Sequence, residues 1–385
     1  MSFVGKACAL GLMVAAILVA PVGGIGTRAA AADELDDLFV RILVNPTDVG
    51  LNLQYARLAE DRGILRKALA TYERILMQDP DNVEAQEGYY RIRRALEPAY
   101  TDITVSLGGR YETNARQSPK SVGRDDDFAV RGQIDLRDER TLMGRRWRTE
   151  GSFLGDVHAD VGDLDFLHVD AVTGPMFDIG SKIRLHTALG GSYAMLDGSD
   201  LYGEAVAKIG IEGILEGALQ RVDLRLAYRD IGDRYSDAEG IVIDLIGRLT
   251  RASILVDSDV FVFYPRIRYS EPTGGSGTTA TPERLYPGDY FEYGGSTAYY
   301  YPLVDSVLLG VTFSGYYRDY DQAILGGGKD REDLYIAPGA QLVFKDVLGP
   351  KTAVRVEYRY EHNFSNDSSE DFVNHVVGVR ASKSF

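Results

Sequence analysis

The stretch VNHVVGVRASKSF, residues 373–385, shows the feature that decides the fold. Its alternate positions form two different sets. The intervening set is mainly polar or small, whereas the other is mainly apolar and consists of Val373, His375, Val377, Val379, Ala381, Lys383 and Phe385. Because successive side chains of a strand point to opposite faces, this period of two predicts a β-strand with one apolar face.

The same alternation recurs through the last three-quarters of the chain. In Thr352–Glu361, apolar residues alternate with four charged ones, and Arg221–Asp230 and Asp127–Arg137 repeat the scheme. These and less regular segments predict about 14 antiparallel strands. The strands are expected to begin near Thr101, Asp127, Trp147, Asp165, Lys182, Leu201, Arg221, Gly240, Asp259, Asp289, Val307, Asp333, Thr352 and Asp371.

The polar face of these strands predicts the surroundings of the sheet. It carries charges of opposite sign two residues apart, as at Arg221 and Asp223. Packing such a face into a dry core would cost too much desolvation, whereas charges can line a wet lumen if the apolar face meets lipid. The sequence therefore predicts an all-β transmembrane barrel, with a soluble β-sandwich as the alternative. Arginines expected to line the lumen, either pairing with inward acids or guiding a substrate, are Arg131, Arg148, Arg225, Arg248, Arg266 and Arg355.

The connectors between the expected strands alternate in length. Long polar connectors are expected at 112–126, 230–239, 271–288, 318–332 and 362–370. Short ones are expected at 178–181, 216–217, 257–258 and 302–305. Transmembrane barrels have long loops outside and short turns in the periplasm. With an even number of strands, both ends of the barrel segment would then lie on the periplasmic side.

The N-terminal segment, residues 1–32, has the pattern of an export signal. Lys6 supplies a positive charge, Ala7–Ala20 is an apolar run, and Ala30–Ala32 offers a cleavage site. The only cysteine, Cys8, lies within this segment, so the exported chain is expected to have neither a thiol nor a disulfide. The formal net charge of −15 disfavours nucleic acid as a partner.

Residues 33–98 are expected to form a small helical domain, followed by the barrel at 99–385. Pro46 and Pro80 stand 34 residues apart, which is the period of the tetratricopeptide repeat. Ala56, Ala68 and Tyr72 occupy the small and aromatic positions of such a repeat, where they would let two helices approach closely. A generic helical hairpin with a chance spacing of prolines is the alternative.

The helical domain is expected to dock a client protein, because repeats of this kind present extended binding surfaces. The residues predicted to make that contact are Tyr55, Tyr72 and Tyr89. Packing inside the domain is the other role open to all three, and Tyr72 matches a packing position of the repeat.

No residue pattern predicts catalysis, a cofactor or a metal. The five histidines lack the close spacing of metal ligands. The aspartates at 156, 160, 163 and 165 could bind Ca²⁺, but a solvated acidic loop is the more ordinary interpretation. The glycine-rich stretches 274–277 and 326–328 precede no helix, so they are interpreted as loop tips.

Two resemblances refine these expectations. A final strand that ends on an aromatic residue, here Phe385, is similar to the assembly signal of outer-membrane β-barrels. A short helical-repeat arm followed by a barrel resembles the surface lipoprotein assembly modifier (Slam) family over the whole exported chain. The segment Tyr111–Asn114 (YETN) looks like the Tyr-Asp-Ser-Asn run at that place in the family, with Glu112 and Thr113 as conservative departures.

The resemblance implies a protein that is not an enzyme. Such a protein translocates or assembles client surface proteins, lipoproteins among them, at the outer membrane, with its helical domain in the periplasm. Its partners would be outer-membrane lipid, the barrel-assembly machinery and client proteins. Two alternatives stay open. An exopolysaccharide export porin also joins tetratricopeptide repeats to a barrel, though with longer arrays and more strands, and a passive porin would carry the arm as a structural addition.

Overall fold

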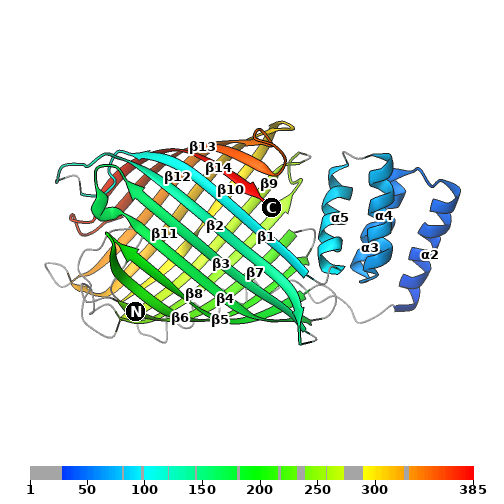
Figure 1. The fold of residues 1–385 in the computed structure, drawn as a ribbon, viewed down its shortest axis with the longest axis horizontal. Coiled ribbons are helices and arrows are strands. Elements are labelled where there is room, and N and C mark those ends of the chain that lie inside the picture. Colours follow the sequence, from blue (N-terminus) through cyan, green and yellow to red (C-terminus); the bar gives the residue numbers. More distant parts are fainter. Residues whose placement is uncertain are drawn as a thin grey trace. The chain divides into compact units, whose positions relative to one another are not determined.

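The computed structural model describes residues 28–79, 82–96, 99–119, 121–143, 145–179, 183–215, 218–231, 239–256, 258–272, 289–324 and 329–385. Most of the predicted export signal, Pro80, Pro98 and the glycine-rich stretches 274–277 and 326–328 lie outside these described residues. The described chain forms two compact units, one helical and one a β-barrel (Figure 1).

The helical unit consists of α2 (Arg28–Val44), α3 (Val49–Asp61), α4 (Leu65–Gln78) and α5 (Val83–Leu96). Each helix packs against the next one in sequence around a continuous apolar core. Helix α2 begins ahead of Asp33, the predicted start of the exported chain. Among the described residues, the helices are too short or too polar to cross a membrane.

Small residues let these helices approach closely. Ala56 and Ala68 are fully buried in the core. A Cβ atom at Gly88 of α5 would lie 2.4 Å from Cζ of Tyr72, so only glycine leaves room for that ring. Gly63 has φ +71°, the left-handed conformation that glycine adopts freely, at the turn between α3 and α4. The predicted small and aromatic positions thus pack as helical repeats do, while membership of the tetratricopeptide family stays a prediction.

Fourteen antiparallel strands form a closed barrel, in which each strand pairs with its neighbours in sequence and β1 pairs with β14. The fold class predicted from the alternation is confirmed, and every predicted strand start lies within three residues of the observed one. The strands are β1 (Ala99–Glu112), β2 (Asp127–Leu142), β3 (Arg145–His158), β4 (Phe166–Ile179), β5 (Ile183–Leu196), β6 (Ser199–Leu215), β7 (Ala218–Ile231), β8 (Gly240–Ala252), β9 (Val260–Pro272), β10 (Tyr290–Val304), β11 (Val307–Ile324), β12 (Asp330–Lys345), β13 (Thr352–Ser365) and β14 (Phe372–Ser384).

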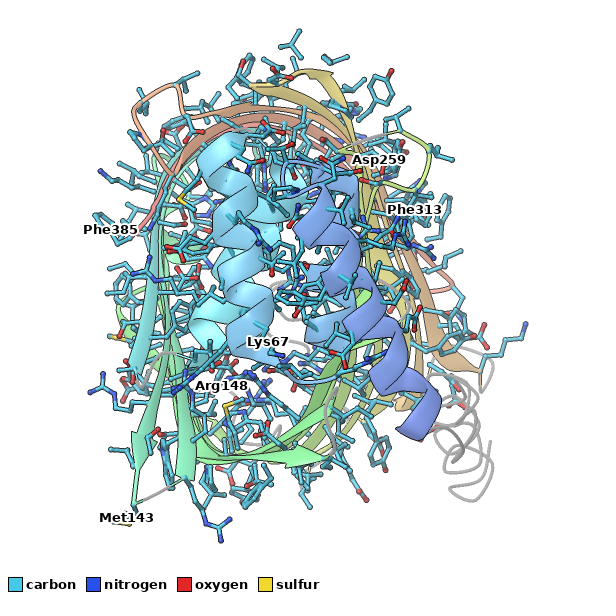
Figure 2. The ribbon with its side chains drawn as sticks, turned by 90° about the vertical axis from the view of Figure 1, so that its right-hand side faces the viewer. Lys67, Met143, Arg148, Asp259, Phe313 and Phe385 are labelled. Atoms are coloured by element: carbon cyan, nitrogen blue, oxygen red, sulfur yellow. The ribbon has the colours of Figure 1, made fainter. Side chains whose placement is uncertain are left out.

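The two faces of the barrel wall differ as the alternation predicts. On β14, the side chain of Val377 is 48% exposed on the outer face, whereas Val376, which points inward, is 3% exposed. Figure 2 shows Phe313 and Phe385 outside the wall and Arg148 inside it. A barrel with an apolar exterior and a charged interior has the design of one that lipid surrounds.

The barrel has two kinds of rim. The rim that carries the connectors after odd-numbered strands is here called the loop end, and the rim that carries those after even-numbered strands is called the turn end. Thr104 pairs with Ser384 near the turn end, so the chain enters and leaves the barrel at the same rim. Outward-facing aromatic residues lie near both rims, with Tyr293 and Tyr317 toward the loop end and Trp147 and Tyr301 toward the turn end. Such aromatic bands mark the two interfaces of a bilayer.

The predicted alternation of connector length needs correction at four connectors. Asp197 and Gly198, at the loop end, form a tight turn, because β5 and β6 pair as far as Leu196 and Ser199. The connector expected at 318–332 is mostly hairpin, since β11 extends to Ile324 and β12 begins at Asp330. At the turn end, 253–259 and 346–351 are longer than a two-residue turn.

Candidate functional site

The lumen of the barrel gathers the charged residues of the strands and is the candidate site. All six arginines expected there lie on the inward-facing set of their strands, and four of them contact inward acids. Arg131 donates to Asp156 at 2.8 Å, and Arg266 lies 3.2 Å from Asp244. Whether these arginines also guide a cargo stays a prediction.

Arg148 of β3 is the most deeply buried arginine of the described residues and forms a cluster with acids from several strands. Its side chain is 1% exposed, although it points into the barrel. Its guanidinium donates to Glu139 of β2 at 2.8 Å and to Glu212 of β6 at 2.9 Å. Glu150 lies 3.8 Å away and also binds Lys208 and Arg221. Arg148 is thus covered by its partners, whereas the side chains of Glu150 and Arg221 stay 18% and 20% exposed.

Asp244 of β8 forms a second cluster with three arginines. Arg268 donates to both carboxylate oxygens at 2.6 and 2.8 Å, and Arg266 and Arg225 approach to 3.2 and 3.7 Å. A buried carboxylate surrounded by arginines is stable only as a pair or network, since an isolated buried charge costs several kcal/mol. The alternation placed these residues on one face, and the strand register brings them together.

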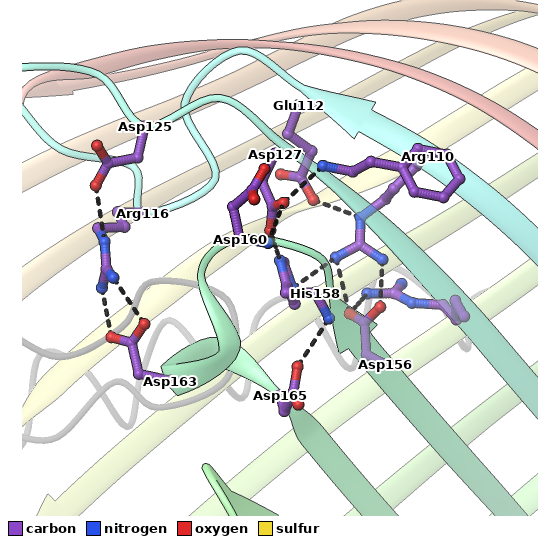
Figure 3. A network of polar contacts seen from close by, with 12 residues as sticks. Arg110, Glu112, Arg116, Asp125, Asp127, Asp156, His158, Asp160, Asp163 and Asp165 are labelled. Atoms are coloured by element: carbon purple, nitrogen blue, oxygen red, sulfur yellow. Dashed lines mark hydrogen bonds and ion pairs between the residues drawn. The ribbon is translucent and has the colours of Figure 1, made fainter.

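A third network lies toward the loop end (Figure 3). Arg110 of β1 binds Asp156 through two nitrogens at 2.5 and 2.8 Å, and Nη2 also lies 3.4 Å from His158. The His158 ring bonds Asp127 at 2.7 Å. In the connectors nearby, Arg116 joins Asp163 to Asp125.

Three of the four aspartates weighed as calcium ligands have carboxylates engaged by other partners. Asp156 and Asp163 bind arginines, and Asp165 accepts from the backbone N–H of His158 at 2.7 Å. Across the described residues, no group of three or more metal-binding side chains is close enough to share an ion.

Among the described residues, Arg355 and Arg380 contact no carboxylate within hydrogen-bond distance. Arg355 of β13 lies directly opposite Arg380 of β14 in the strand register. Oε2 of Glu357 lies 3.9 Å from Nη2 of Arg380, beyond hydrogen-bond distance. Arg248 also contacts no described carboxylate, but it contacts the hydroxyl of Thr250 and the ring of Tyr264. Sequence reasoning did not single out Arg380, because the face of a residue can be predicted from alternation but its cross-strand partner cannot.

The predicted docking tyrosines belong to the core of the helical unit. Tyr55 and Tyr72 are 4% and 1% exposed, and Tyr89 packs against the same core while its ring faces Arg93. Burial and the nearby Glu60 carboxylate raise the pKa of Tyr72 well above its ordinary value, so its hydroxyl stays a neutral donor to Glu60 at 3.2 Å. Direct contact of Tyr55 or Tyr72 with a client would require the helices to part.

No protein-family model matches the sequence, and a search of curated proteins finds no match. Solved structures give low-identity similarities to outer-membrane proteins. The outer membrane channel DcaP of Acinetobacter baumannii has 9% identity and a TM-score of 0.44, covering 74% of this chain and 97% of that one. OccK5 (OpdH) of Pseudomonas aeruginosa has 10% identity and a TM-score of 0.39, covering 74% and 98%.

A bacterial polysaccharide outer membrane secretin has 13% identity and a TM-score of 0.40, covering 74% of this chain and 97% of that one. At these identities and TM-scores the similarities carry no inference about cargo. The fold assignment rests on the strand pairing within the barrel itself.

Proposed function

We propose that this chain is a channel of the outer membrane that carries hydrophilic cargo through its lumen. The observation that carries the proposal is the division of the barrel wall, with apolar side chains outside and paired charges inside. A barrel standing in water would need the opposite arrangement. With the observed arrangement, a dry core would have to hold the charges, and the apolar face would meet solvent.

The buried state of several inward charges bears on the kind of cargo. Arg148, Asp244 and Glu292 face the lumen yet are almost fully covered by other side chains. We infer that side chains narrow the passage at their levels. This favours small polar solutes, or a segment of unfolded chain, over a bulky polysaccharide.

The proposal is tested on the whole protein in two steps. Membrane fractionation and heat-modifiable migration on gels should place the folded barrel in the outer membrane, and a soluble periplasmic product would contradict the proposal. The purified protein should then conduct ions in planar bilayers and admit small sugars into liposomes. A folded, inserted barrel that does neither would exclude an open channel.

A second function, export of client surface proteins, has its own supporting observation. The chain carries a packed unit of four helices ahead of the barrel, which a passive pore does not need. In this proposal the helical unit is a periplasmic docking element, and the barrel provides passage or a seam for the client. Since Tyr55 and Tyr72 are buried, the docking surface would consist of exposed residues of the helices, with Tyr89 at its edge.

Surface proteomics of intact cells distinguishes the candidates. A strain lacking the protein is complemented with the full chain or with a chain lacking the helical unit. Export of clients predicts that the shortened chain still inserts but leaves one or a few surface proteins in the periplasm. Unchanged surface proteins with loss of an extracellular polysaccharide would instead identify a polysaccharide exporter. Loss of small-solute uptake alone would identify a porin.

A further inference from the structure

The wall formed by β13 and β14 brings two arginines together with little compensation, whereas the similar pair Arg221 and Arg248 on β7 and β8 has Glu150 and Asp223 bound to Arg221. Arg355 and Arg380 are directly opposite each other in the register, and both point inward. Like charges at directly opposite positions of an antiparallel pair are destabilising. Such an arrangement needs a compensating partner, and violations of local rules of this kind concentrate at functional sites.

The protein supplies little compensation in the part of the chain that the structure describes. Glu357 approaches Arg380 only to 3.9 Å, and Arg355 has no described carboxylate within 4 Å. Nε of Arg355 is buried and has no hydrogen-bond partner there. The charge of Arg131, from β2, acts on Arg380 as a further repulsion. The neighbouring Arg359 is the contrast, since Glu361 holds it at 2.5 Å.

Across the seam with β1, the residues beside Arg380 are small or carry hydroxyl groups, whereas Val343 of β12 lies opposite Arg355. Arg380 is flanked across the seam by Gly108 of β1, where a Cβ atom would lie 2.9 Å from the Cβ of Arg380. One pleat nearer the turn end, Ser106 lies opposite Ser382. Hydroxyl donors next to guanidinium groups are the usual surroundings of an oxyanion in a protein.

We propose that Arg355 and Arg380 form a binding site for the oxyanion group of a cargo, a carboxylate or a phosphate, on the lumen wall. A guanidinium offers donors in a planar fork that matches both groups, and two forks side by side favour a ligand with more than one negative charge. The bound anion supplies the missing countercharge. The site adds a preference for anionic cargo to the proposed channel, although binding itself does not depend on conduction.

Binding is measured by titration calorimetry on the full chain in neutral detergent at low ionic strength. Sodium citrate and inorganic phosphate serve as separate probes, so that the two arms distinguish a carboxylate site from a phosphate site. Arg355→Gln and Arg380→Gln should each weaken binding of the preferred probe at least about tenfold, the loss expected for a charge-assisted contact. Heat-modifiable migration confirms that each variant is folded.

Two control variants remove an arginine elsewhere. Arg359→Gln acts on the same strand and the same face, and Arg140→Gln removes an outward arginine that binds Asp138. Both should leave affinity within about twofold, because their charges are already paired. No binding of either probe to the parent protein, or equal weakening in the controls, would overturn the proposal.

Thermal stability gives an independent readout. Removing an arginine that only stabilises the barrel would lower the unfolding temperature, whereas removing Arg355 should raise it. In the absence of the probe, Arg355→Gln should raise the temperature of heat-modifiable unfolding, and added salt should shrink that difference by screening the repulsion. Arg359→Gln should lower it. Citrate or phosphate should stabilise the parent but not the Arg355→Gln variant. If Arg355→Gln destabilises the barrel like Arg359→Gln, the two arginines are structural. If the probe binds but bilayers show no conductance, the site stands and the channel proposal fails.

Discussion

Replacing Val356 by arginine tests the assignment of the outer face to lipid. Val356 points outward from β13, between Leu342 of β12 and Val379 of β14 in the register. An arginine on the lipid face near the bilayer midplane costs about 2–4 kcal/mol in a transmembrane barrel. With a urea dependence of about 1–3 kcal/mol per molar, this cost should lower the unfolding midpoint by roughly 0.7–4 M.

Unfolding can be followed in lipid vesicles by the fluorescence of Trp147, because the chain has one tryptophan. Its indole N–H donates to the hydroxyl of Thr173 at 2.7 Å on the outer face, so the signal reports the β3–β4 pairing. Two controls bracket the result. Val347→Arg places the same charge in the connector between β12 and β13, where the cost should be at most about 1 kcal/mol. Arg355→Ala, on the lumen face, should not destabilise the barrel as Val356→Arg does, because it removes the repulsion from Arg380.

Three outcomes would refute the reasoning. Equal destabilisation by Val356→Arg and Arg355→Ala would show that the two faces meet similar surroundings. The reverse order would show that the faces are assigned backwards. Equal effects of Val356→Arg and Val347→Arg would show that the cost does not depend on depth in a bilayer.

Three further predictions concern separate parts of the molecule. Phe385→Ala should lower the yield of inserted barrel, measured by heat-modifiable migration. The backbone N–H of Phe385 donates to the carbonyl oxygen of Ile103 at 3.0 Å, and its ring faces outward as the predicted assembly signal. A normal yield would contradict that prediction. Gly88→Leu should destabilise the helical unit by about 1–3 kcal/mol through overpacking against the Tyr72 ring, measured as an earlier loss of helical circular dichroism on heating. Burial of Asp259 opposes its ionisation, but hydrogen bonds from the backbone N–H groups of residues 254–256 outweigh burial and lower its pKa. Its ionised form therefore contributes stability above the unfolded pKa of about 3.9, and that contribution is lost as the pH falls through the lower folded pKa. Asp259→Asn should accordingly flatten the acid limb of stability against pH in urea titrations, and an unchanged limb would contradict this account.

The fold was predictable because alternation records burial directly. A strand with one face on lipid and one in a polar lumen must alternate, and the segment Thr352–Glu361 does so throughout. Its apolar residues Val356 and Tyr358 are exposed on the outside, and its charged residues Arg359 and Glu361 pair on the inside. Connector lengths were harder to predict, because strand pairing can continue into polar sequence. It does so where the backbone N–H of Asp321 donates to the backbone carbonyl of Asp289.

The candidate site was only partly predictable, because it depends on register. Alternation places Arg148 in the lumen, but its partners Glu139 and Glu212 come from β2 and β6 and follow only from the pairing of five strands. The same limit hid the opposition of Arg355 and Arg380. In the helical unit, a spacing of one repeat selects packing positions as readily as binding positions, so the sequence leaves both roles open to Tyr55, which lies in the core.

Pairing in the lumen separates stability from function. Around Arg148 and Asp244, each charge is offset by partners from several strands, so these clusters hold the barrel wall together and leave little for a cargo to bind. At Arg355 and Arg380 the wall instead keeps a repulsion that a single substitution would remove. Removing one of these arginines would make the barrel more stable. The same change would remove the positive charge that binds an anionic cargo. The sign of the stability change on Arg355→Gln therefore decides between the two roles more directly than any transport rate.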